Sequence, residues 1–532
     1  MKNLDFVHLH LHTEYSPLDG IIKIRDLINQ AKEYGMTAVA ITDHGSMSGL
    51  YEAQKYGEKQ GIKVIQGCEF YHIHEDKNAH IIVLAKNDEG LRNLNLLHES
   101  SYVDGFYKKP NILMHDLVRL RNGLIVMTAC LGSELNQYLL KGNMEQANLY
   151  VQNMRQIFGD DFYIEVQSNS IPEQLYVNQE LVKLAKKYNV KYVLTNDVHY
   201  MYETDAFAHE VSLGLQFNKK FSDAKRYKFP TNDFWFKTAE EMFNTCVGLT
   251  KEEIVTAMNV TKEIEGKCNS SYKKGKYLPS YWDKSDTPRK LLTNIINKNS
   301  VELGLAKNKD YMKQVQNELN IIDEEGYCDY FLVVKDYVNA ARENGILVGD
   351  GRGSGAGSKV AYISDISRIE PEQYGLLFER FMAHNRVPDI DIDFSDQEFV
   401  FNYLRQRYGE QNVARIIAFG TLAPKAVSRK VLSFFEKDKI DIDAVSKLIP
   451  DLCESMEMAY KASPDLLKYK KKFPIEFQVI ERLEGVVSHE SQHAGGVVIY
   501  EGLNQMLPLK SDGSNRNIRI AAFDKYMLEE LG

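Results

Sequence analysis

Residues 6–20 read Phe-Val-His-Leu-His-Leu-His-Thr-Glu-Tyr-Ser-Pro-Leu-Asp-Gly, and the fold is best approached from this stretch. Its first six residues are apolar enough for a buried strand that ends in the pattern His10-x-His12. Side chains two positions apart on a strand point to the same face, so both imidazoles can reach one cation. Asp19 follows in the next loop and adds a carboxylate to the same neighbourhood.

Short apolar segments like this one recur through the first 200 residues, and helix-like stretches at 24–34, 49–60 and 174–188 lie between them. Alternation of this kind predicts parallel strands joined by right-handed crossovers. Seven such units favour a (β/α)7-like barrel over an open sheet. The expected strands are residues 6–11, 38–42, 63–66, 80–85, 124–128, 162–166 and 192–195.

Metal-ligand residue types follow most of these expected strands. In a (β/α) barrel the carboxyl ends of the strands form one rim, so side chains at these ends converge. Mixed imidazole, carboxylate and thiolate ligands suit Zn²⁺, Mn²⁺ or Fe better than Ca²⁺. A lone His-x-His pair is more often structural, but eight or nine ligand types on one rim favour a metal site. These residues are His10, His12, Asp19, Asp43, His44, Glu69, Cys130, Asp197 and His199, with His80 opening its strand instead of ending it.

The motifs His-Leu-His-Thr-x-Tyr-Ser-x-Leu-Asp-Gly, Ile-Thr-Asp-His-Gly and Gly-Cys-Glu-Phe resemble the PHP (polymerase and histidinol phosphatase) domain of bacterial replicative polymerases. The resemblance implies a site for up to three metal ions, Zn²⁺ or Mn²⁺, and metal-dependent 3′–5′ exonuclease or phosphoester-hydrolysing activity. All nine ligand types of that family are present. They fall on His10, His12, Asp19, His44, Glu69, His80, Cys130, Asp197 and His199.

Two motifs in the second half concern phosphate and metal binding. Residues 348–358 form a glycine-rich turn between a strand and a helix, where backbone N–H groups can approach an anion. Residues 388–394 read Pro-Asp-Ile-Asp-Ile-Asp-Phe, which predicts a strand with Asp389, Asp391 and Asp393 on one face. Like charges on one face repel unless cations lie among them, so this pattern indicates Mg²⁺ and phosphoryl transfer. A plain loop and an exposed acidic strand are the structural alternatives.

A basic stretch follows at residues 401–435, which contain six Lys or Arg against the single acid Glu410. In an acidic chain this is a candidate surface for a DNA backbone or a triphosphate, although this feature alone favours a solvated basic helix face. The candidate DNA-binding residues are Arg405, Arg407, Arg415, Arg429 and Lys430.

With Ala-Phe-Gly-Thr-Leu-Ala-Pro-Lys-Ala and His493-Ala-Gly-Gly-Val-Val-Ile, these motifs resemble the palm of the bacterial DNA polymerase III alpha family, in family order. The resemblance implies a nucleotidyltransferase-like palm that acts on a DNA primer-template and dNTP. Asp391 and Asp393 would hold catalytic Mg²⁺. The residues implied to face the incoming nucleotide are Arg352, Gly353, Ser354, Ser358 and Lys425, and Asp350 replaces the proline usual in relatives.

The last residues match the family's Phe-Asp-x-x-x-Leu-Glu-x-x-Gly motif, in which Asp524 is the noncatalytic aspartate. The third catalytic aspartate of the family follows that motif, so we expect a second polypeptide to supply it together with the fingers and C-terminal regions. The expected domains are a PHP barrel at 1–275, palm at 276–430 and 485–532, and a helical thumb at 431–484. A stand-alone PHP phosphoesterase and a non-catalytic assembly subunit are the alternatives.

Composition sets the remaining limits. The 532 residues carry a formal net charge of −9, with 44% hydrophobic and 26% charged residues, which is typical of a globular chain of several domains. The acidic balance excludes a uniformly basic nucleic-acid coat but permits a local basic surface. Six cysteines without a Cys-x-x-Cys pair predict a reducing, cytoplasmic setting, and no apolar run is long enough to cross a membrane.

Overall fold

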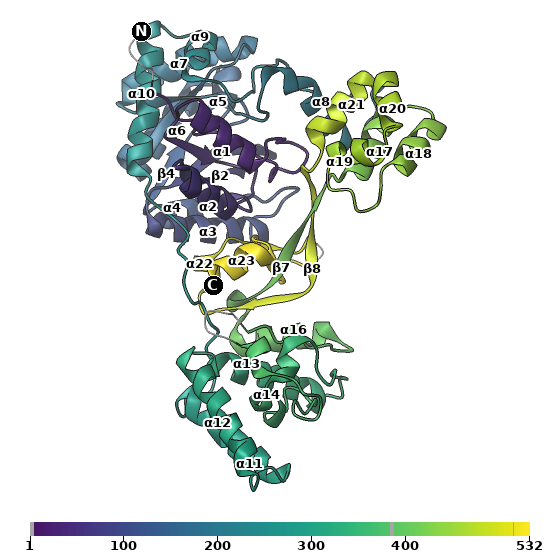
Figure 1. Ribbon diagram of the computed structural model, residues 1–532. Coiled ribbons are helices and arrows are strands. Elements are labelled where there is room, and N and C mark those ends of the chain that lie inside the picture. Colours follow the sequence, from purple (N-terminus) through teal and green to yellow (C-terminus); the bar gives the residue numbers. More distant parts are fainter. Residues whose placement is uncertain (1–4, 383–387, 514) are drawn as a thin grey trace. The chain divides into compact units, whose positions relative to one another are not determined.

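The computed structural model describes residues 5–382, 388–513 and 515–532, and the chain forms two compact units (Figure 1). The larger unit contains residues up to 273 together with 416–493 and 504–528. The smaller unit contains 274–415, 494–503 and 529–532. Each unit therefore combines segments that are distant in sequence. The domain limits expected at 275, 430 and 484 stay predictions.

A six-stranded sheet in the order β1-β2-β3-β4-β5-β6 forms the centre of the larger unit. Every strand expected from 38 to 195 is present, and four of them extend beyond the expected limits at one end. The strands are β1 (Ala38–Ile41), β2 (Lys63–His74), β3 (Lys77–Ala85), β4 (Leu124–Met127), β5 (Phe162–Gln167) and β6 (Lys191–Thr195).

The expectation of parallel strands throughout is wrong at β3, which runs antiparallel to both β2 and β4. The chain reverses at Glu75 and Asp76, whose positive φ angles of 45° and 60° are typical of a two-residue hairpin turn. Glu-Asp is a weak hairpin signal compared with Asn-Gly, so the sequence did not indicate this turn. The pairs β1–β2, β4–β5 and β5–β6 are parallel as expected.

The expected first strand, residues 6–11, is extended but contributes only an isolated bridge from Leu11 to Val198. Its backbone nevertheless forms hydrogen bonds with neighbouring segments on both sides. His8 and Leu11 accept from the amides of Ala40 and Thr42, and His10 accepts from the amide of Val198. The segment thus lies between β1 and the chain after β6, and the sheet is a curled half-barrel that brings its strand ends together.

Helices surround this sheet, and apolar side chains of the sheet fill its interior, among them Val7, Ala40, Ile82 and Val193. Local sequence sets several helix starts, as where Thr250 and Glu253 form a reciprocal capping box. The helices up to residue 273 are α1 (Ile24–Glu33), α2 (Leu50–Gln60), α3 (Asp88–Val103), α4 (Met114–Arg119), α5 (Glu134–Leu140), α6 (Met144–Phe158), α7 (Pro172–Tyr188), α8 (Ala206–Gln216), α9 (Ala239–Thr245) and α10 (Lys251–Lys267).

A second group of helices in the larger unit comes from residues 424–483, which include the segment expected to form a helical thumb. Proline at the first helical position starts two of them, where its missing N–H costs no hydrogen bond. They are α17 (Pro424–Phe434), α18 (Lys439–Leu448), α19 (Met456–Ala462), α20 (Leu466–Lys472) and α21 (Pro474–Leu483).

The smaller unit is mainly helical and has its own core, which contains Leu292, Val315, Phe331, Val338 and Phe381. Within it the glycine-rich turn forms a short 3-10 helix, Gly353–Gly357, that leads into α14. Its helices are α11 (Pro288–Glu302), α12 (Lys309–Glu324), α13 (Cys328–Glu343), α14 (Lys359–Ile363), α15 (Phe378–Phe381) and α16 (Gln397–Tyr408).

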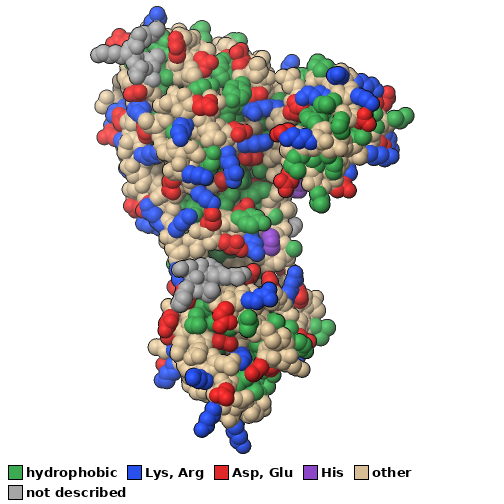
Figure 2. Space-filling model, viewed as in Figure 1, with side chains coloured by type: hydrophobic (Ala, Val, Ile, Leu, Met, Phe, Trp, Pro, Cys, Tyr) green, Lys and Arg blue, Asp and Glu red, His purple; other side chains and the backbone are tan. Residues whose placement is uncertain are grey.

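A second, four-stranded sheet has the order β8-β7-β10-β9. Its strands are β7 (Val413–Thr421), β8 (Val487–Ile499), β9 (Leu509–Ser511) and β10 (Arg519–Ala521), and two short helices complete the chain, α22 (Leu503–Met506) and α23 (Lys525–Leu531). Among the described helices, none has the length and apolar character that crossing a bilayer requires. On the face shown in Figure 2, Lys and Arg side chains are interspersed with Asp and Glu.

Candidate metal centre

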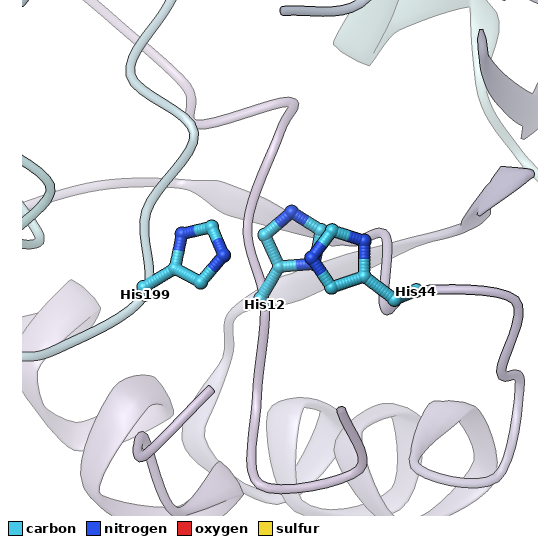
Figure 3. A group of neighbouring side chains, drawn as sticks. All are labelled: His12, His44 and His199. Atoms are coloured by element: carbon cyan, nitrogen blue, oxygen red, sulfur yellow. The ribbon is translucent and has the colours of Figure 1, made fainter. Parts of the chain in front are cut away.

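Three histidines from separate segments meet at the rim of the curled sheet (Figure 3). His12 ends the N-terminal segment, His44 follows β1, and His199 follows β6. The ring of His12 stacks on that of His44 with 3.9 Å between centroids, and it lies 4.4 Å from the ring of His199. Three imidazoles this close are an arrangement typical of a metal site.

A second group, deeper in the sheet, joins His10 and His12 to two carboxylates. Glu69 Oε2 lies 2.8 Å from His10 Nε2 and 3.1 Å from His12 Nε2. Asp197 Oδ1 lies 3.1 Å from the same two nitrogens. The two histidines therefore point to one side of the extended segment, as their spacing predicted.

The third group consists of Glu69, His80 and Cys130, so Glu69 is common to two groups. Cys130 Sγ lies 3.4 Å from His80 Nδ1, and the same nitrogen also contacts Glu69. His80 fits the strand-end rule only because β3 is antiparallel. The early residues of an antiparallel strand lie beside the late residues of its neighbours, and His80 pairs with Tyr71 near the end of β2.

Asp19 completes the set of nine expected ligands. Its Oδ2 lies 3.4 Å from His44 Nε2, and its Oδ1 lies 3.7 Å from His199 Nε2. The loop that carries it is tight at Gly20, where a β-carbon would approach the carbonyl oxygen of Thr13 to 2.2 Å. A glycine is required there, and all nine sequence-predicted residues converge on one region of the larger unit.

One supporting residue, Glu165, escaped the sequence analysis, and another, Asp43, was predicted as a possible ligand. Glu165, in the middle of β5, lies 2.6 Å from His10 Nδ1 and accepts from the Thr195 hydroxyl, so it fixes which ring nitrogen of His10 faces the cluster. Asp43 had looked like a ligand type, but it accepts from the Thr13 amide at 2.6 Å and from the Ser16 hydroxyl at 2.8 Å. An acid inside a buried strand was the available signal for Glu165.

His209 also borders the cluster. It is buried in α8, and its Nε2 lies 3.8 Å from Asp19 Oδ1. Its ring centroid is 5.5 Å from that of His199. His209 is thus placed to orient Asp19 and not to replace a ligand.

The carboxylates of the cluster create an environment that favours positively charged groups or ions within it. Burial alone lowers the pKa of His10, but the carboxylates of Asp197, Glu165 and Glu69 outweigh burial and hold this pKa well above its usual value. Burial alone raises the pKa of Asp197, but His10 and His12 hold that pKa well below its usual value. The carboxylates therefore stay ionised, and cations are the natural counter-charge for them.

The donor set fits divalent transition metals. Within the described part of the chain, the buried Nδ1 atoms of His12 and His44 have no hydrogen-bond partner. A buried polar atom without a partner is costly, and a cation among these side chains would remove much of that cost. Imidazole, carboxylate and thiolate donors together are typical of Zn²⁺, Mn²⁺ or Fe.

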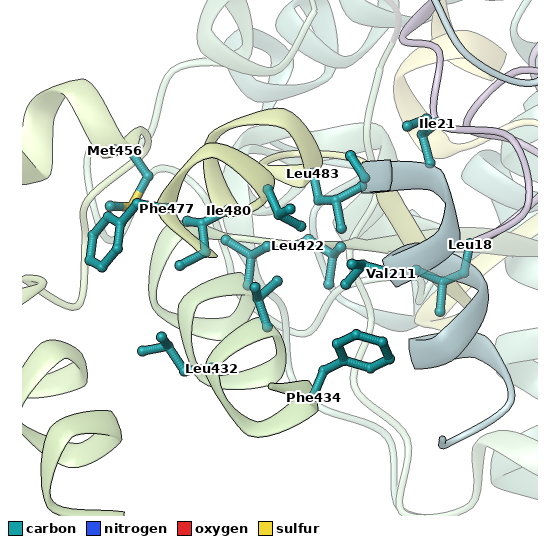
Figure 4. Packing of buried hydrophobic residues seen from close by; sticks show 14 of the residues in the cluster. Leu18, Ile21, Val211, Leu422, Leu432, Phe434, Met456, Phe477, Ile480 and Leu483 are labelled. Carbon is teal, nitrogen blue, oxygen red and sulfur yellow. The ribbon is translucent and has the colours of Figure 1, made fainter. Parts of the chain in front are cut away.

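Residues distant in sequence hold the ligand loops in place. Leu18 and Ile21, on either side of Asp19, belong to a hydrophobic core with Val211 of α8 and Leu483 of α21, and Figure 4 shows them facing the helices of residues 424–483. Near His44, the Tyr102 hydroxyl donates to the Gly45 carbonyl. The ligand loops thus depend on helices outside the sheet.

The polymerase-type motifs lie in the smaller unit and make an exposed arrangement. Residues 389–394 are extended, with exposed aspartates alternating with partly buried Ile390, Ile392 and Phe394. The expected strand is reduced to one bridge between Val348 and Phe394. The predicted alternation of faces is therefore present without a hydrogen-bonded ladder.

The glycine-rich turn lies beside these aspartates. Arg352 Nη1 is 3.0 Å from Asp393 Oδ1, and a β-carbon on Gly353 would lie 2.9 Å from Asp391 Oδ2. Ser354 is partly exposed, whereas Ser358 is buried and donates to Glu318 while capping α14. The hydroxyl of Ser358 is therefore directed into the core and away from the aspartates.

Most of the remaining basic candidates are engaged with carboxylates. Arg405 pairs with Glu410, Arg407 with Asp336 and Arg415 with Glu398, all in the smaller unit. In the larger unit Lys425 pairs with Asp451 at 2.5 Å and Arg429 with Asp443 at 3.1 Å, next to exposed Lys430. The five DNA-binding candidates are thus divided between the units.

Comparison with known proteins agrees with this site. The family model of the PHP domain matches residues 8–169, and that of the bacterial DNA polymerase III alpha NTPase domain matches residues 289–532. The fold and donor set thus define a PHP-type, metal-binding domain in the first part of the chain. A solved putative metal-dependent phosphoesterase from Bifidobacterium adolescentis covers 47% of this chain and 99% of its own at 17% identity, with a TM-score of 0.27, too low to carry an argument.

Curated relatives extend the match to the whole chain. DNA polymerase III subunit alpha of Aquifex aeolicus is 36% identical over 588 residues, covering 99% of this chain and 50% of its own length. The corresponding subunit of Treponema pallidum is 35% identical and covers 100% and 47%. The chain is therefore similar along its whole length to bacterial DNA polymerase III alpha subunits, and it spans about half the length of the curated relatives it matches.

Proposed function

We propose that the nine-residue cluster holds two or three Zn²⁺ or Mn²⁺ ions and hydrolyses phosphodiesters at the 3′ end of DNA, as a proofreading exonuclease. The observation that carries this proposal is the convergence of eight ligand-type side chains in three groups, two of which share Glu69, with Asp19 beside His44 and His199 as the ninth. When bound, such metals activate water and neutralise phosphate charge.

The protein's own groups would prepare this chemistry. Glu165 holds His10 with Nε2 toward the cluster, at 2.6 Å from the opposite ring nitrogen. Asp43 fixes the loop of residues 13–16 by accepting from the amide and hydroxyl of Thr13. The side chains of Asp19 and His80, 25% and 22% exposed, mark the side from which a substrate enters.

The test is release of the terminal nucleotide from a labelled primer with a 3′ mismatch, by the full chain with Mn²⁺ or Zn²⁺. We expect release that is lost in His12→Ala. If the metal-loaded chain releases nothing while His12→Ala has lost metal, the centre is a structural one and the scaffold alternative holds.

We further propose that Asp391 and Asp393, with Arg352, Gly353 and Ser354, form part of a polymerase site that uses Mg²⁺ and dNTP on a primer-template. The proximity of the glycine-rich turn to these aspartates supports this proposal. Because the curated relatives are about twice as long as the matched region, polymerisation is proposed for these residues only together with the remaining polymerase regions. Primer extension by the chain alone would contradict that division.

A further inference from the structure

Residues 217–229, which connect α8 to the chain before α9, combine basic and aromatic side chains next to the metal centre. They read Phe-Asn-Lys-Lys-Phe-Ser-Asp-Ala-Lys-Arg-Tyr-Lys-Phe and contain five Lys or Arg against one acid, in a chain of net charge −9. Phe217 is 52% exposed and Tyr227 is 55% exposed. Large exposed aromatic rings within a positively charged segment are typical of protein surfaces that bind single-stranded nucleic acid.

An aromatic series leads from this exposed segment to the metal cluster. The ring centroids of Phe217 and Tyr227 are 6.1 Å apart, and those of Tyr227 and Phe229 are also 6.1 Å apart. Phe229 lies 4.8 Å from the ring of the ligand His199 and 4.6 Å from that of His209. The series therefore ends at a side chain of the proposed hydrolytic site.

The segment is anchored, so its exposed side chains have fixed positions. The Phe221 amide donates to the Phe434 carbonyl, and Arg226 pairs with Glu210 at 2.6 Å. Within the described part of the chain, Lys225 and Lys228 have no carboxylate partner, and both side chains are exposed.

We propose that residues 217–229 bind single-stranded DNA and guide its 3′ end into the metal centre, with bases stacked on Phe217 and Tyr227 and phosphates near Lys225 and Lys228. The direction in which the DNA strand would move rests on the proposed hydrolytic function. Binding of DNA to residues 217–229 can be measured separately. The lysines would also offset the repulsion between a phosphate backbone and the acidic cluster.

The first experiment measures binding of a fluorescent 12-nucleotide oligothymidylate to the full chain by anisotropy, with chelator present so that nothing is hydrolysed. Phe217→Ala/Tyr227→Ala is expected to raise Kd by about tenfold or more, because each stacked base contributes substantially. Tyr227→Phe retains the ring and is expected to bind like the parent. The matched control is Tyr176→Ala/Tyr374→Ala, two exposed aromatics elsewhere, which should leave Kd unchanged.

The second experiment repeats the titration at several salt concentrations. Lys225→Ala/Lys228→Ala should reduce the slope of log K against log salt by about 1.4, since each phosphate contact to a single strand contributes about 0.7. Lys307→Ala/Lys313→Ala, which removes two exposed charges from the smaller unit, should not change the slope. Unchanged Kd and slope in the segment variants would overturn the proposal.

A separate assay keeps the two proposals apart. Hydrolysis of bis(p-nitrophenyl) phosphate by the parent chain with Mn²⁺ requires the metal centre but no strand binding. If the parent chain does not hydrolyse this substrate but the segment variants still bind oligothymidylate more weakly, the binding surface is supported and the hydrolytic function is contradicted. If hydrolysis succeeds and the variants bind normally, the hydrolytic function stands and DNA reaches the centre by another route.

Discussion

The chain contains two acidic clusters that differ in how completely they are assembled. In the larger unit, Glu69 and Asp197 are buried among histidines, and each carboxylate contacts at least two of them. In the smaller unit, Asp391 and Asp393 are exposed, and Asp393 pairs with the equally exposed Arg352. Burial fixes the geometry of the first cluster before any ligand arrives, whereas the second can still adjust.

This difference predicts that hydrolysis by the isolated chain takes place in the larger unit. The largest expected effect of a substitution tests this prediction directly. Asp197→Ala removes an oxygen that lies 3.1 Å from both His10 and His12, so we expect loss of bound metal and a fall in hydrolysis of about 100-fold or more. Asp391→Ala should leave hydrolysis unchanged. Metal content and release from a mismatched primer are the measurements, and loss of hydrolysis in Asp391→Ala would place the activity in the smaller unit.

The next effect concerns the packing behind the ligand loops. Leu483→Ala empties a fully buried position in the core that contains Leu18 and Ile21, and we expect a loss of about 2–5 kcal/mol in the larger unit. Metal affinity should fall as well, because Asp19 lies between those two residues. Leu319→Ala is the matched change in the core of the smaller unit and should spare metal binding. Scanning calorimetry with metal titration compares them, and equal metal loss in both would contradict separate cores.

A smaller effect is expected from the partner that orients His10. Glu165→Gln keeps the size and a hydrogen-bonding oxygen at 2.6 Å from His10 Nδ1, but it removes the negative charge. Changes of this kind typically cost 10- to 100-fold in metal affinity or activity. Titration of metal into the apo chain measures the affinity, and Gln167→Ala, a neighbour that donates to Glu165, controls for disturbed packing. Parent-like affinity in Glu165→Gln would mean that geometry alone orients the ring.

The sequence predicted much of this site because its residues are held in short motifs. His10, His12, His44 and Asp197 all lie at the ends of predicted strands, and the curled sheet brings those ends together. His80 did not fit, because the β2–β3 hairpin reverses the strand and its turn, Glu75-Asp76, carries no strong signal. A one-dimensional pattern does not specify strand direction when the turn residues are ordinary.

What the sequence could not supply were contacts across long separations. Glu165 is 155 positions from His10, so no local spacing links them. The core that joins Leu18 to Leu483 likewise cannot be predicted from hydrophobic periodicity. Periodicity predicts that a helix is amphipathic, but not which surface its apolar face covers. The basic stretch at 401–435 was a single feature in sequence, yet its arginines belong to two units and pair with nearby acids.

The smallest expected effect is a pH dependence confined to the smaller unit. Burial raises the pKa of Glu318 to about 7, although its carboxylate accepts from the Val360 amide and the Ser358 hydroxyl. A carboxyl whose folded pKa exceeds its unfolded value binds its proton more tightly when folded, so its contribution is complete below about pH 4.5 and declines as pH rises toward 7. The slope cannot exceed about 1.4 kcal/mol per pH unit for one proton. Glu318→Gln should flatten the dependence of the smaller unit's unfolding on pH between 4.5 and 7, leaving the larger unit's transition where it was. A parent-like slope in Glu318→Gln would show that other carboxyls set the pH response, and that folding does not raise the pKa of the buried acid behind the glycine-rich turn.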